Sequence, residues 1–401
     1  MLRILDSTLR EGEQTPGVCF DLHIKLAIAD LLAAIGVDII EAGHPAVTEE
    51  IHQAVRMIAG RGLRPLVGAH ARSLEADVEM ALECGVGFLG IFYCVSEERL
   101  ADRATDLDNA VARIAAVVRL AKARKPELIV RYTPEDAVRS PFSNVVTAAA
   151  AACAAGADVI SIADTTGFMI PGTARSFYDY VARLRDDLAA RGFAPQIAVH
   201  CHNDRGLALA NALDAMRAGA NIIDASVLGL GERAGIVDLG TLLAVLAQDF
   251  GYDGRWELKR LPELYRLVSQ YAGVPVPVNL PVTGKNAFTH CAGVHTQAAI
   301  RNPMHYQSLD PAIVGREPTI ALDHMAGMAA LRFSLARIGH EHMPDGFARL
   351  VLKRVKEVGQ SGRTVDLEEL RYIVLAVLEH ENRYGNSLPP ARLSQGRVEA
   401  R

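Results

Sequence analysis

Two histidines separated by a single residue, His200 and His202, are the side chains in this sequence best suited to chemistry. They follow an apolar run at 196–199 that is typical of a short buried strand. Side chains at positions i and i+2 of a strand point to the same face, so both imidazoles face the same way near the strand's C-terminal end. Two such imidazoles suit a divalent metal. A pair of hydrogen-bonded core histidines is the alternative, and the position at a strand end favours the metal.

The elements that must position these histidines repeat along the chain. Continuous apolar runs alternate with helical patterns, which is typical of parallel strands buried on both faces. Eight such units in about 250 residues predict an α/β fold, a (β/α)8 TIM barrel. A doubly wound open sheet is the alternative, but no G-x-G-x-x-G follows the first strand. The expected strands are 3–5, 37–41, 64–68, 87–92, 127–131, 158–162, 196–200 and 221–225, and the expected helices are 21–35, 46–60, 73–85, 106–124, 141–155, 171–190, 206–218 and 236–249.

Polar side chains gather where the expected strands end. The C-terminal ends of the strands carry the active site in TIM barrels. A purely structural barrel would not need so much charge at one rim. These residues are Arg10, Glu11, Glu41, His70, Arg72, Arg131, Thr133, Asp164, Thr165, His200, His202 and Ser226.

A metal held by two histidines also needs a carboxylate, and the loop after the first strand offers Asp6 and Glu11. Such a cation keeps positive charge and open positions for the carbonyl and carboxylate oxygens of a 2-oxo acid, whose carbonyl it would polarise. Mixed nitrogen and oxygen ligation does not select between Zn²⁺, Mn²⁺ and Mg²⁺. Arg10 could stabilise an oxyanion on that carbonyl. A salt bridge tying the barrel rim is the alternative for Arg10.

A second anion site is indicated at the end of the fifth strand. Arg131 and Thr133 share one face there and could clamp a second anionic group of the substrate. An ion pair of Arg131 with Glu135 or Asp136 is the alternative.

Composition and charge indicate which partners and which cellular compartment to expect for this chain. The net charge is −5 and the pI is about 6.2, without a Lys/Arg-rich face, so we expect no nucleic-acid partner. Six scattered cysteines without a C-x-x-C predict a reduced, cytoplasmic chain without disulfides. No signal peptide and no membrane-spanning run is expected.

The chain is expected to divide into three parts. Residues 1–250 form the catalytic barrel. The Pro- and Gly-containing stretch 251–285 is predicted to be a linker, and 286–401 a mainly helical C-terminal lid and dimerisation region.

Four motifs in order resemble the superfamily of acyl-CoA Claisen-condensing enzymes and lyases, which includes isopropylmalate, citramalate and homocitrate synthases and hydroxymethylglutaryl-CoA lyase. The stretch 5–14, Leu-Asp-Ser-Thr-Leu-Arg-Glu-Gly-Glu-Gln, resembles its first signature. The stretches 200–206 and 228–233 resemble its second and third signatures. The stretch 288–295, with Tyr306, is similar to the lid segment of the synthases.

The resemblance implies a TIM barrel with a divalent metal held by Glu11, His200 and His202, and with Arg10 polarising the carbonyl. It implies that His295 and Tyr306 lie on a lid donated by the partner subunit of a homodimer. His295, together with Glu41 or a neighbour, would deprotonate the methyl group of acetyl-CoA. The enolate would attack a 2-oxo acid, and thioester hydrolysis would release CoA. The expected substrate contacts are Gln14, His70, Arg72, Arg131, Thr133 and Thr165.

The identity of the 2-oxo acid follows from the stretch 130–136, which is similar to homocitrate synthases. In those enzymes an Arg, a hydroxyl two residues later and a Thr hold the distal carboxylate of 2-oxoglutarate. The matching positions in this chain are Arg131, Thr133 and Thr165. The stretch 43–45, with Cys291 and Gln297, departs from that group. Oxaloacetate, phosphonopyruvate, pyruvate or 2-oxoisovalerate are therefore alternative substrates. A hydroxyacyl-CoA lyase, a metallohydrolase and a non-catalytic binding barrel are alternative functions.

Overall fold

The computed structural model describes residues 2–291 and 293–384 of the chain. It divides into two compact units, a barrel unit, Met1–Val276, and a C-terminal unit, Pro277–Arg401. Among the helices of the described residues, none combines the length and the apolar character that crossing a membrane requires.

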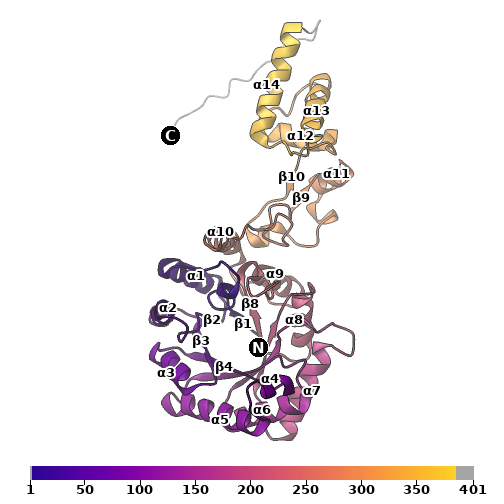
Figure 1. Cartoon of the computed structure of the whole chain (residues 1–401). Coiled ribbons are helices and arrows are strands. Elements are labelled where there is room, and N and C mark those ends of the chain that lie inside the picture. Colours follow the sequence, from indigo (N-terminus) through magenta and orange to yellow (C-terminus); the bar gives the residue numbers. More distant parts are fainter. Residues whose placement is uncertain (1, 292, 385–401) are drawn as a thin grey trace. The chain divides into compact units, whose positions relative to one another are not determined.

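The barrel unit contains eight parallel strands that close in sequence order, with helices around the outside (Figure 1). The prediction of a TIM barrel is confirmed. The strands are β1 (Arg3–Asp6), β2 (Ile39–Glu41), β3 (Leu66–Arg72), β4 (Phe88–Cys94), β5 (Ile129–Glu135), β6 (Val159–Asp164), β7 (Gln196–Cys201) and β8 (Ile222–Ala225). The helices are α1 (Leu22–Ile35), α2 (Glu49–Ala59), α3 (Glu75–Glu83), α4 (Glu97–Asp102), α5 (Leu107–Arg124), α6 (Phe142–Ala154), α7 (Phe177–Ala190), α8 (Ala208–Arg217), α9 (Leu239–Asp249) and α10 (Leu261–Ala272).

Several strands extend further toward the site than the sequence predicted. Strands β3 and β5 continue through Arg72 and Glu135, where the expected strands ended at 68 and 131. The prediction stopped where the apolar run stopped. At a barrel rim, however, polar side chains face the mouth while their backbone still pairs with the neighbouring strands, as Thr133 does with Phe92. Helix α4 was not predicted, and α7 begins at Phe177, six positions later than expected.

The predicted linker is largely part of the barrel unit. Residues 251–276 belong to that unit, and helix α10 lies within them. The helix buries Leu261, Leu264 and Val268, which offsets the conformational entropy of ordering the segment. Its Tyr265 hydroxyl donates to Asp238 Oδ1 at 2.6 Å and accepts from the Gly240 amide at 2.6 Å. Pro and Gly residues around the helix gave the stretch a linker-like composition.

An apolar plug fills the barrel beneath its polar mouth. Leu5, Phe88 and Ile222 are fully buried there and belong to one cluster with Ile39, Val159 and Ala198. These side chains exclude water from the barrel interior and leave the C-terminal strand ends as the place for polar groups.

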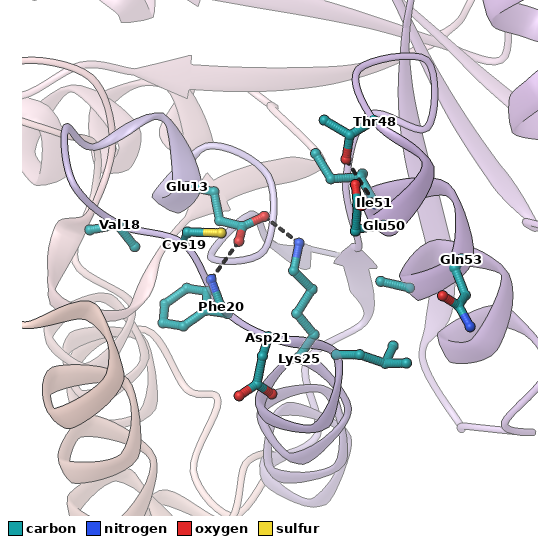
Figure 2. Close-up of a pocket in the computed structure, with 12 residues that line it drawn as sticks. Glu13, Val18, Cys19, Phe20, Asp21, Lys25, Thr48, Glu50, Ile51 and Gln53 are labelled. Carbon is teal, nitrogen blue, oxygen red and sulfur yellow. Dashed lines mark hydrogen bonds and ion pairs between the residues drawn. The ribbon is translucent and has the colours of Figure 1, made fainter.

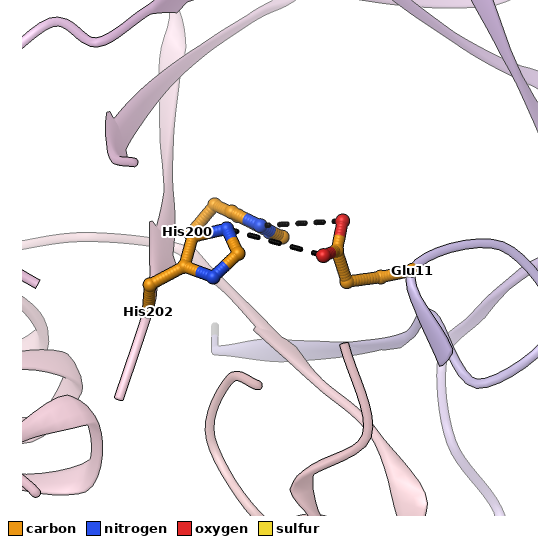
Figure 3. Close-up of side chains that lie close together, drawn as sticks. All are labelled: Glu11, His200 and His202. Atoms are coloured by element: carbon orange, nitrogen blue, oxygen red, sulfur yellow. Dashed lines mark ion pairs between the residues drawn. The ribbon is translucent and has the colours of Figure 1, made fainter. Parts of the chain in front are cut away.

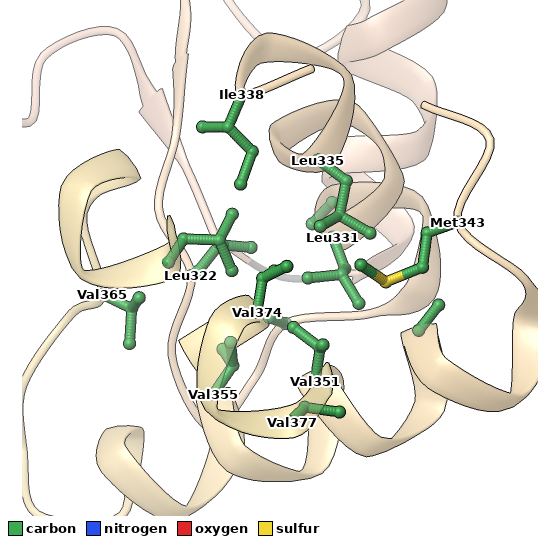
Figure 4. Packing of buried hydrophobic residues seen from close by; sticks show 14 of the residues in the cluster. Leu322, Leu331, Leu335, Ile338, Met343, Val351, Val355, Val365, Val374 and Val377 are labelled. Atoms are coloured by element: carbon green, nitrogen blue, oxygen red, sulfur yellow. The ribbon is translucent and has the colours of Figure 1, made fainter. Parts of the chain in front are cut away.

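The C-terminal unit has a hydrophobic core of its own. Short strands β9 (Thr289–His290) and β10 (Thr319–Ile320) pair in parallel, and helices follow. Leu331, Val351 and Val374 lie at the centre of this core (Figure 4). The helices are α11 (Gly293–Arg301), α12 (Met328–Arg337), α13 (Asp345–Gly359) and α14 (Leu367–Tyr384).

The loop after β8 depends on Gly235. Its φ is +73°, and a Cβ there would lie 1.7 Å from the Gly229 carbonyl oxygen. We expect Gly235→Ala to cost more than about 3 kcal/mol and to lower Tm by roughly 10 °C, measured by scanning calorimetry. Gly254→Ala is the matched control, because Gly254 has a φ of +69° with open space around it. It should cost only about 1–2 kcal/mol. Equal losses would mean that the clash at Gly235 relaxes.

Candidate metal centre and active site

Glu11, His200 and His202 meet at the mouth of the barrel (Figure 3). Glu11 follows β1, His200 lies on β7, and His202 lies directly after β7. One ligand atom of each lies within 4.8 Å of the others, and all three residues are buried. His200 Nε2 is 3.8 Å from Glu11 Oε2, and His202 Nε2 is 3.9 Å from Glu11 Oε1. Alternation along the strand therefore points both imidazoles at one carboxylate.

The chemistry of these three side chains fits a divalent cation. Two ligands that each lie about 2.2 Å from one ion are separated by at most about 4.4 Å, and the two imidazole–carboxylate distances fall within that limit. Burial, followed by the neighbouring His200, lowers the pKa of His202 to about 4, so its ring is neutral at pH 7. A histidine must be neutral to bind a metal ion. Burial opposes the ionised form of Glu11, but its neighbours, Arg10 foremost, outweigh burial and lower its pKa.

Asp224 on β8 holds one of the metal-facing rings. Its Oδ2 lies 3.0 Å from His200 Nδ1, which leaves Nε2 of that ring toward Glu11. A carboxylate on the second ring nitrogen fixes the tautomer and the orientation of a ligating histidine. Asp224 also accepts two hydrogen bonds from Arg131 Nη1 at 2.9 Å each.

Glu41 connects the two arginines of the site. Its Oε2 accepts from Arg10 Nε at 2.7 Å, and its Oε1 accepts from Arg131 Nη2 at 3.1 Å. Ser7 donates a further bond to Oε2 at 2.6 Å. Burial opposes the ionised form of Glu41, yet Arg10 and Arg131 hold its pKa well below its ordinary value. Burial also works against the charged form of Arg10, but Glu41 and Glu11 outweigh it and raise its pKa, so the guanidinium remains charged.

A cavity of about 170 Å³ opens beside the triad and collects most of the predicted site residues. The structure brings together the three metal-binding candidates, the carbonyl-polarising candidate and five of the six predicted substrate contacts. Those that line it are Arg10, Glu11, Gln14, His70, Arg131, Thr133, Thr165, His200 and His202.

Unpartnered polar atoms face this cavity from β3 and β5. Both ring nitrogens of His70, Arg131 Nε and the Thr133 hydroxyl are buried without a hydrogen-bond partner. Burial, and then Arg10, lowers the pKa of His70 well below its ordinary value, so the ring is neutral. Buried polar groups normally find partners, so a bound molecule or water at this cluster would complete their hydrogen bonds.

Two predicted residues of the barrel unit, Glu41 and Arg72, do not line the cavity. Glu41 is fully buried and committed to Arg10 and Arg131, so it is not among the lining residues. Arg72 is half-exposed and bound to Asp77 through Nε at 2.7 Å, and it lines a neighbouring hollow.

His295 and Tyr306 belong to the C-terminal unit. Their rings contact one another, with centroids 4.4 Å apart, and both side chains are exposed. Their role on a lid donated by a partner subunit stays a prediction.

Sequence reasoning missed several residues of the site. Asp224 is an acid inside the apolar strand 222–225, a signal that could have found it. His44 and Glu232 also line the cavity. His44 Nε2 lies 3.1 Å from Asp77 Oδ2. Its position after β2 was noted only as a departure from a motif, and nothing local reveals that it reaches the cavity.

A larger pocket, of about 500 Å³, lies between the loop after β1 and the starts of α1 and α2 (Figure 2). It contains the buried ion pair of Lys25 with Glu13, whose other oxygen accepts from the Phe20 amide at 2.8 Å. Within the described residues, the group that could hold a metal is the triad and not this pocket. Size alone therefore does not identify the site.

Comparison with known families identifies the barrel. The HMGL-like family matches residues 1–268. The chain belongs to the HMGL-like family. Residues 282–363 match a second family, described as homocitrate synthase post-HMGL domain-like.

Curated relatives place the chain more narrowly within the HMGL-like family. It is 42% identical over 354 residues to a homocitrate synthase of Pyrococcus horikoshii, covering 88% of this chain and 94% of the relative. It is 39% identical over 375 residues to a homocitrate synthase of Saccharolobus islandicus, covering 92% and 79%. The chain is therefore an enzyme, an acyltransferase of the class that homocitrate synthases represent.

Solved structures agree on the HMGL-like fold. An HMG-CoA lyase of Bacillus subtilis matches with a TM-score of 0.57 and 23% identity, over 69% of this chain and 95% of that one. An HMG-CoA lyase of Acinetobacter baumannii, solved with coenzyme A and 3-methylmalate, matches with a TM-score of 0.58 and 20% identity, over 69% and 93%. At this identity the likeness concerns the fold.

The triad makes a prediction about metal affinity. Glu11→Gln keeps the shape of the side chain but removes the negative ligand, so Mn²⁺ affinity should fall by more than the roughly 10- to 100-fold that loss of an outer-shell partner costs. Titration calorimetry with Mn²⁺ on chelator-treated protein measures it. Glu232→Gln is the control, because Glu232 lines the same cavity outside the triad. Unchanged affinity in Glu11→Gln would refute the site.

Proposed function

We propose that this enzyme condenses acetyl-CoA with a 2-oxo diacid, 2-oxoglutarate in the first place, to give homocitrate and free CoA. The relatives named homocitrate synthase support the reaction class. The cluster of unpartnered polar atoms on His70, Arg131 and Thr133 supports the diacid, and it is the observation that carries the proposal. These groups form a donor set for an anion beside the metal centre, where a distal carboxylate would complete their hydrogen bonds.

The residues divide the work between the two ends of the 2-oxo acid. A divalent cation held by Glu11, His200 and His202 would supply Lewis acidity to the keto oxygen. Arg10 adds a fixed positive charge beside Glu11, where negative charge develops on that oxygen during carbon–carbon bond formation. Arg131, Thr133, Thr165 and His70 would bind the far carboxylate, and Gln14 would contact the near end of the molecule.

The proton and the thioester must also be accounted for. The acetyl methyl group loses a proton, the new bond forms to the keto carbon, and hydrolysis of the thioester releases CoA. We assign the proton transfer to His295 with Tyr306, whose exposed rings lie against one another. We further propose that a second copy of the chain, in a homodimer, contributes this pair to the barrel. Glu41 acts from beneath the cavity by holding Arg10 and Arg131.

A panel of 2-oxo acids tests the reaction. Metal-treated enzyme with acetyl-CoA should release thiol fastest with 2-oxoglutarate, and more slowly with oxaloacetate, phosphonopyruvate, pyruvate and 2-oxoisovalerate. A chelator should abolish release, and product mass should identify homocitrate. Thiol release with none of these acids would reject the proposed function. Preference for another acid would reject the assignment of 2-oxoglutarate and keep the reaction class.

The diacid clamp is tested by conservative variants. Arg131→Lys keeps the buried charge but loses the fork, and Thr133→Val removes only the hydroxyl. Thr133→Val should lower kcat/KM for 2-oxoglutarate by roughly 10- to 100-fold while changing that for pyruvate by less than about threefold, since hydrogen bonds to charged groups are worth about 1.5–3 kcal/mol. Arg131→Lys should lower kcat/KM for both acids, because it also loosens the bonds to Asp224 and Glu41, but it should lower that for 2-oxoglutarate more. Equal losses for both acids would mean that these residues are structural.

A further inference from the structure

A second hollow, of about 270 Å³, lies next to the metal cavity at the same end of the barrel. Phe92, at the end of β4, lines both spaces, so they share a wall. The hollow is built from the ends of β3 and β4, the turn after α4, and one residue of α5. The residues that line it are Arg72, Ser73, Leu74, Phe92, Tyr93, Arg103, Thr105 and Arg113.

Positive charge dominates this hollow. The guanidinium carbon of Arg103 lies 4.7 Å from the centre of the Tyr93 ring, and that of Arg113 lies 5.8 Å from it. The nearest carboxylate that pairs with Arg103 is Glu135, at 3.9 Å. No ion pair joins Arg113 to a carboxylate within the part of the chain that the structure describes. Two like charges held on one ring, with little compensation, create a field that attracts an anion.

Arg72 forms a fixed edge of the hollow. Asp77 accepts from its Nε at 2.7 Å and from its Nη2 at 2.9 Å. The same carboxylate contacts His44, which lines the metal cavity. Asp77 thus links a residue of the metal cavity, His44, to a residue of the hollow, Arg72. Because Asp77 neutralises Arg72, that arginine adds hydrogen-bond donors to the hollow but little net charge.

The arginines inside the metal cavity are committed to carboxylates of the protein and to the proposed 2-oxo acid. Arg10 is paired with Glu11 and Glu41, and Arg131 with Glu41 and Asp224. The proposed acyl donor, however, carries three phosphate groups at its ADP end, joined to the acetyl group by a long, uncharged arm. Its phosphates therefore require a separate positive site, outside the cavity but within reach of it.

We propose that this hollow binds the phosphate groups at the ADP end of acetyl-CoA, with Arg103 and Arg113 as the ionic contacts and the Tyr93 ring holding both guanidinium planes in place. The inference rests on the proposed function and names a subsite for it. The planar donor fork of arginine matches phosphate geometry. The wall at Phe92 then separates the anionic end of the donor from the reacting end.

Truncated acyl donors test the proposal. Arg103→Ala/Arg113→Ala should raise KM for acetyl-CoA at least tenfold, because hydrogen bonds between charged groups contribute roughly 10- to 100-fold in affinity. S-acetylpantetheine lacks all three phosphates, so its kcat/KM should be the same in the variant and the native enzyme. KM for 2-oxoglutarate should also stay the same. Acetyl-dephospho-CoA lacks only the 3′-phosphate, so its KM distinguishes the contribution of the 3′-phosphate to binding from that of the diphosphate.

Arg119→Ala is the matched control, since Arg119 is an exposed arginine on the same helix, α5, and does not line the hollow. It should leave KM for acetyl-CoA unchanged. Added salt should raise KM for acetyl-CoA in the native enzyme more than in the double variant, because exposed charges are screened.

Three results would overturn the proposal. First, KM for acetyl-CoA could stay unchanged in the double variant. Second, kcat/KM could fall equally for acetyl-CoA and S-acetylpantetheine, which would indicate a structural role for the two arginines. Alternatively, pyrophosphate could inhibit the native enzyme without competing with acetyl-CoA and lose that effect in the double variant, which would indicate a separate site for free phosphate.

Failure of the proposed function is distinguishable from failure of the subsite. If no 2-oxo acid supports thiol release, calorimetric titration of CoA into the native and double-variant proteins still decides the matter. Weaker binding of CoA to the double variant, with Arg119→Ala unaffected, supports the subsite without turnover. Equal binding to all three proteins rejects it.

Discussion

A continuous set of buried ion pairs beneath the barrel mouth is the constraint on which the site depends. Glu41 binds Arg10 and Arg131, and Asp224 binds Arg131 and His200. Each of these groups is nearly or fully buried, and a buried charge left without its partner costs several kcal/mol. The network therefore holds every member in one arrangement. It fixes the His200 ring of the candidate metal centre and the proposed diacid clamp at Arg131 through one shared carboxylate, Asp224.

Barrel closure makes this network possible. Arg10 follows β1, and Glu41, Arg131, His200 and Asp224 lie on β2, β5, β7 and β8. Side chains on non-adjacent strands meet because the strand ends converge around one axis above an apolar plug. The plug excludes water below, and the lower dielectric strengthens each ion pair above it. The ring nitrogens of His70, Arg131 Nε and the Thr133 hydroxyl remain unpartnered here, on residues that line the cavity.

Each unit has a hydrophobic core of its own, but most of the candidate site residues lie in the barrel unit. The C-terminal unit has its own core of aliphatic side chains around Leu331 and Val351, so its fold does not rely on the barrel for hydrophobic burial. It presents His295 and Tyr306 on its surface. The barrel unit carries the candidate metal centre, the proposed substrate donors and the basic hollow. The proposed metal and substrate recognition therefore resides in one unit, and the proposed proton transfer in the other.

The sequence by itself determined the barrel and the direction of its metal-facing histidines. Apolar runs of strand length specify buried parallel strands, and a period of two places His200 and His202 on one side whatever surrounds them. Only the tertiary structure decided that Asp224 joins Arg131, 93 positions away, to His200. Only the tertiary structure shows that Arg72 pairs with Asp77, that Glu41 is fully buried beneath the cavity, and that 261–272 form a helix of the barrel unit. Local patterns depend on neighbours a few residues apart, whereas the partner of a charged side chain depends on which strands close against each other.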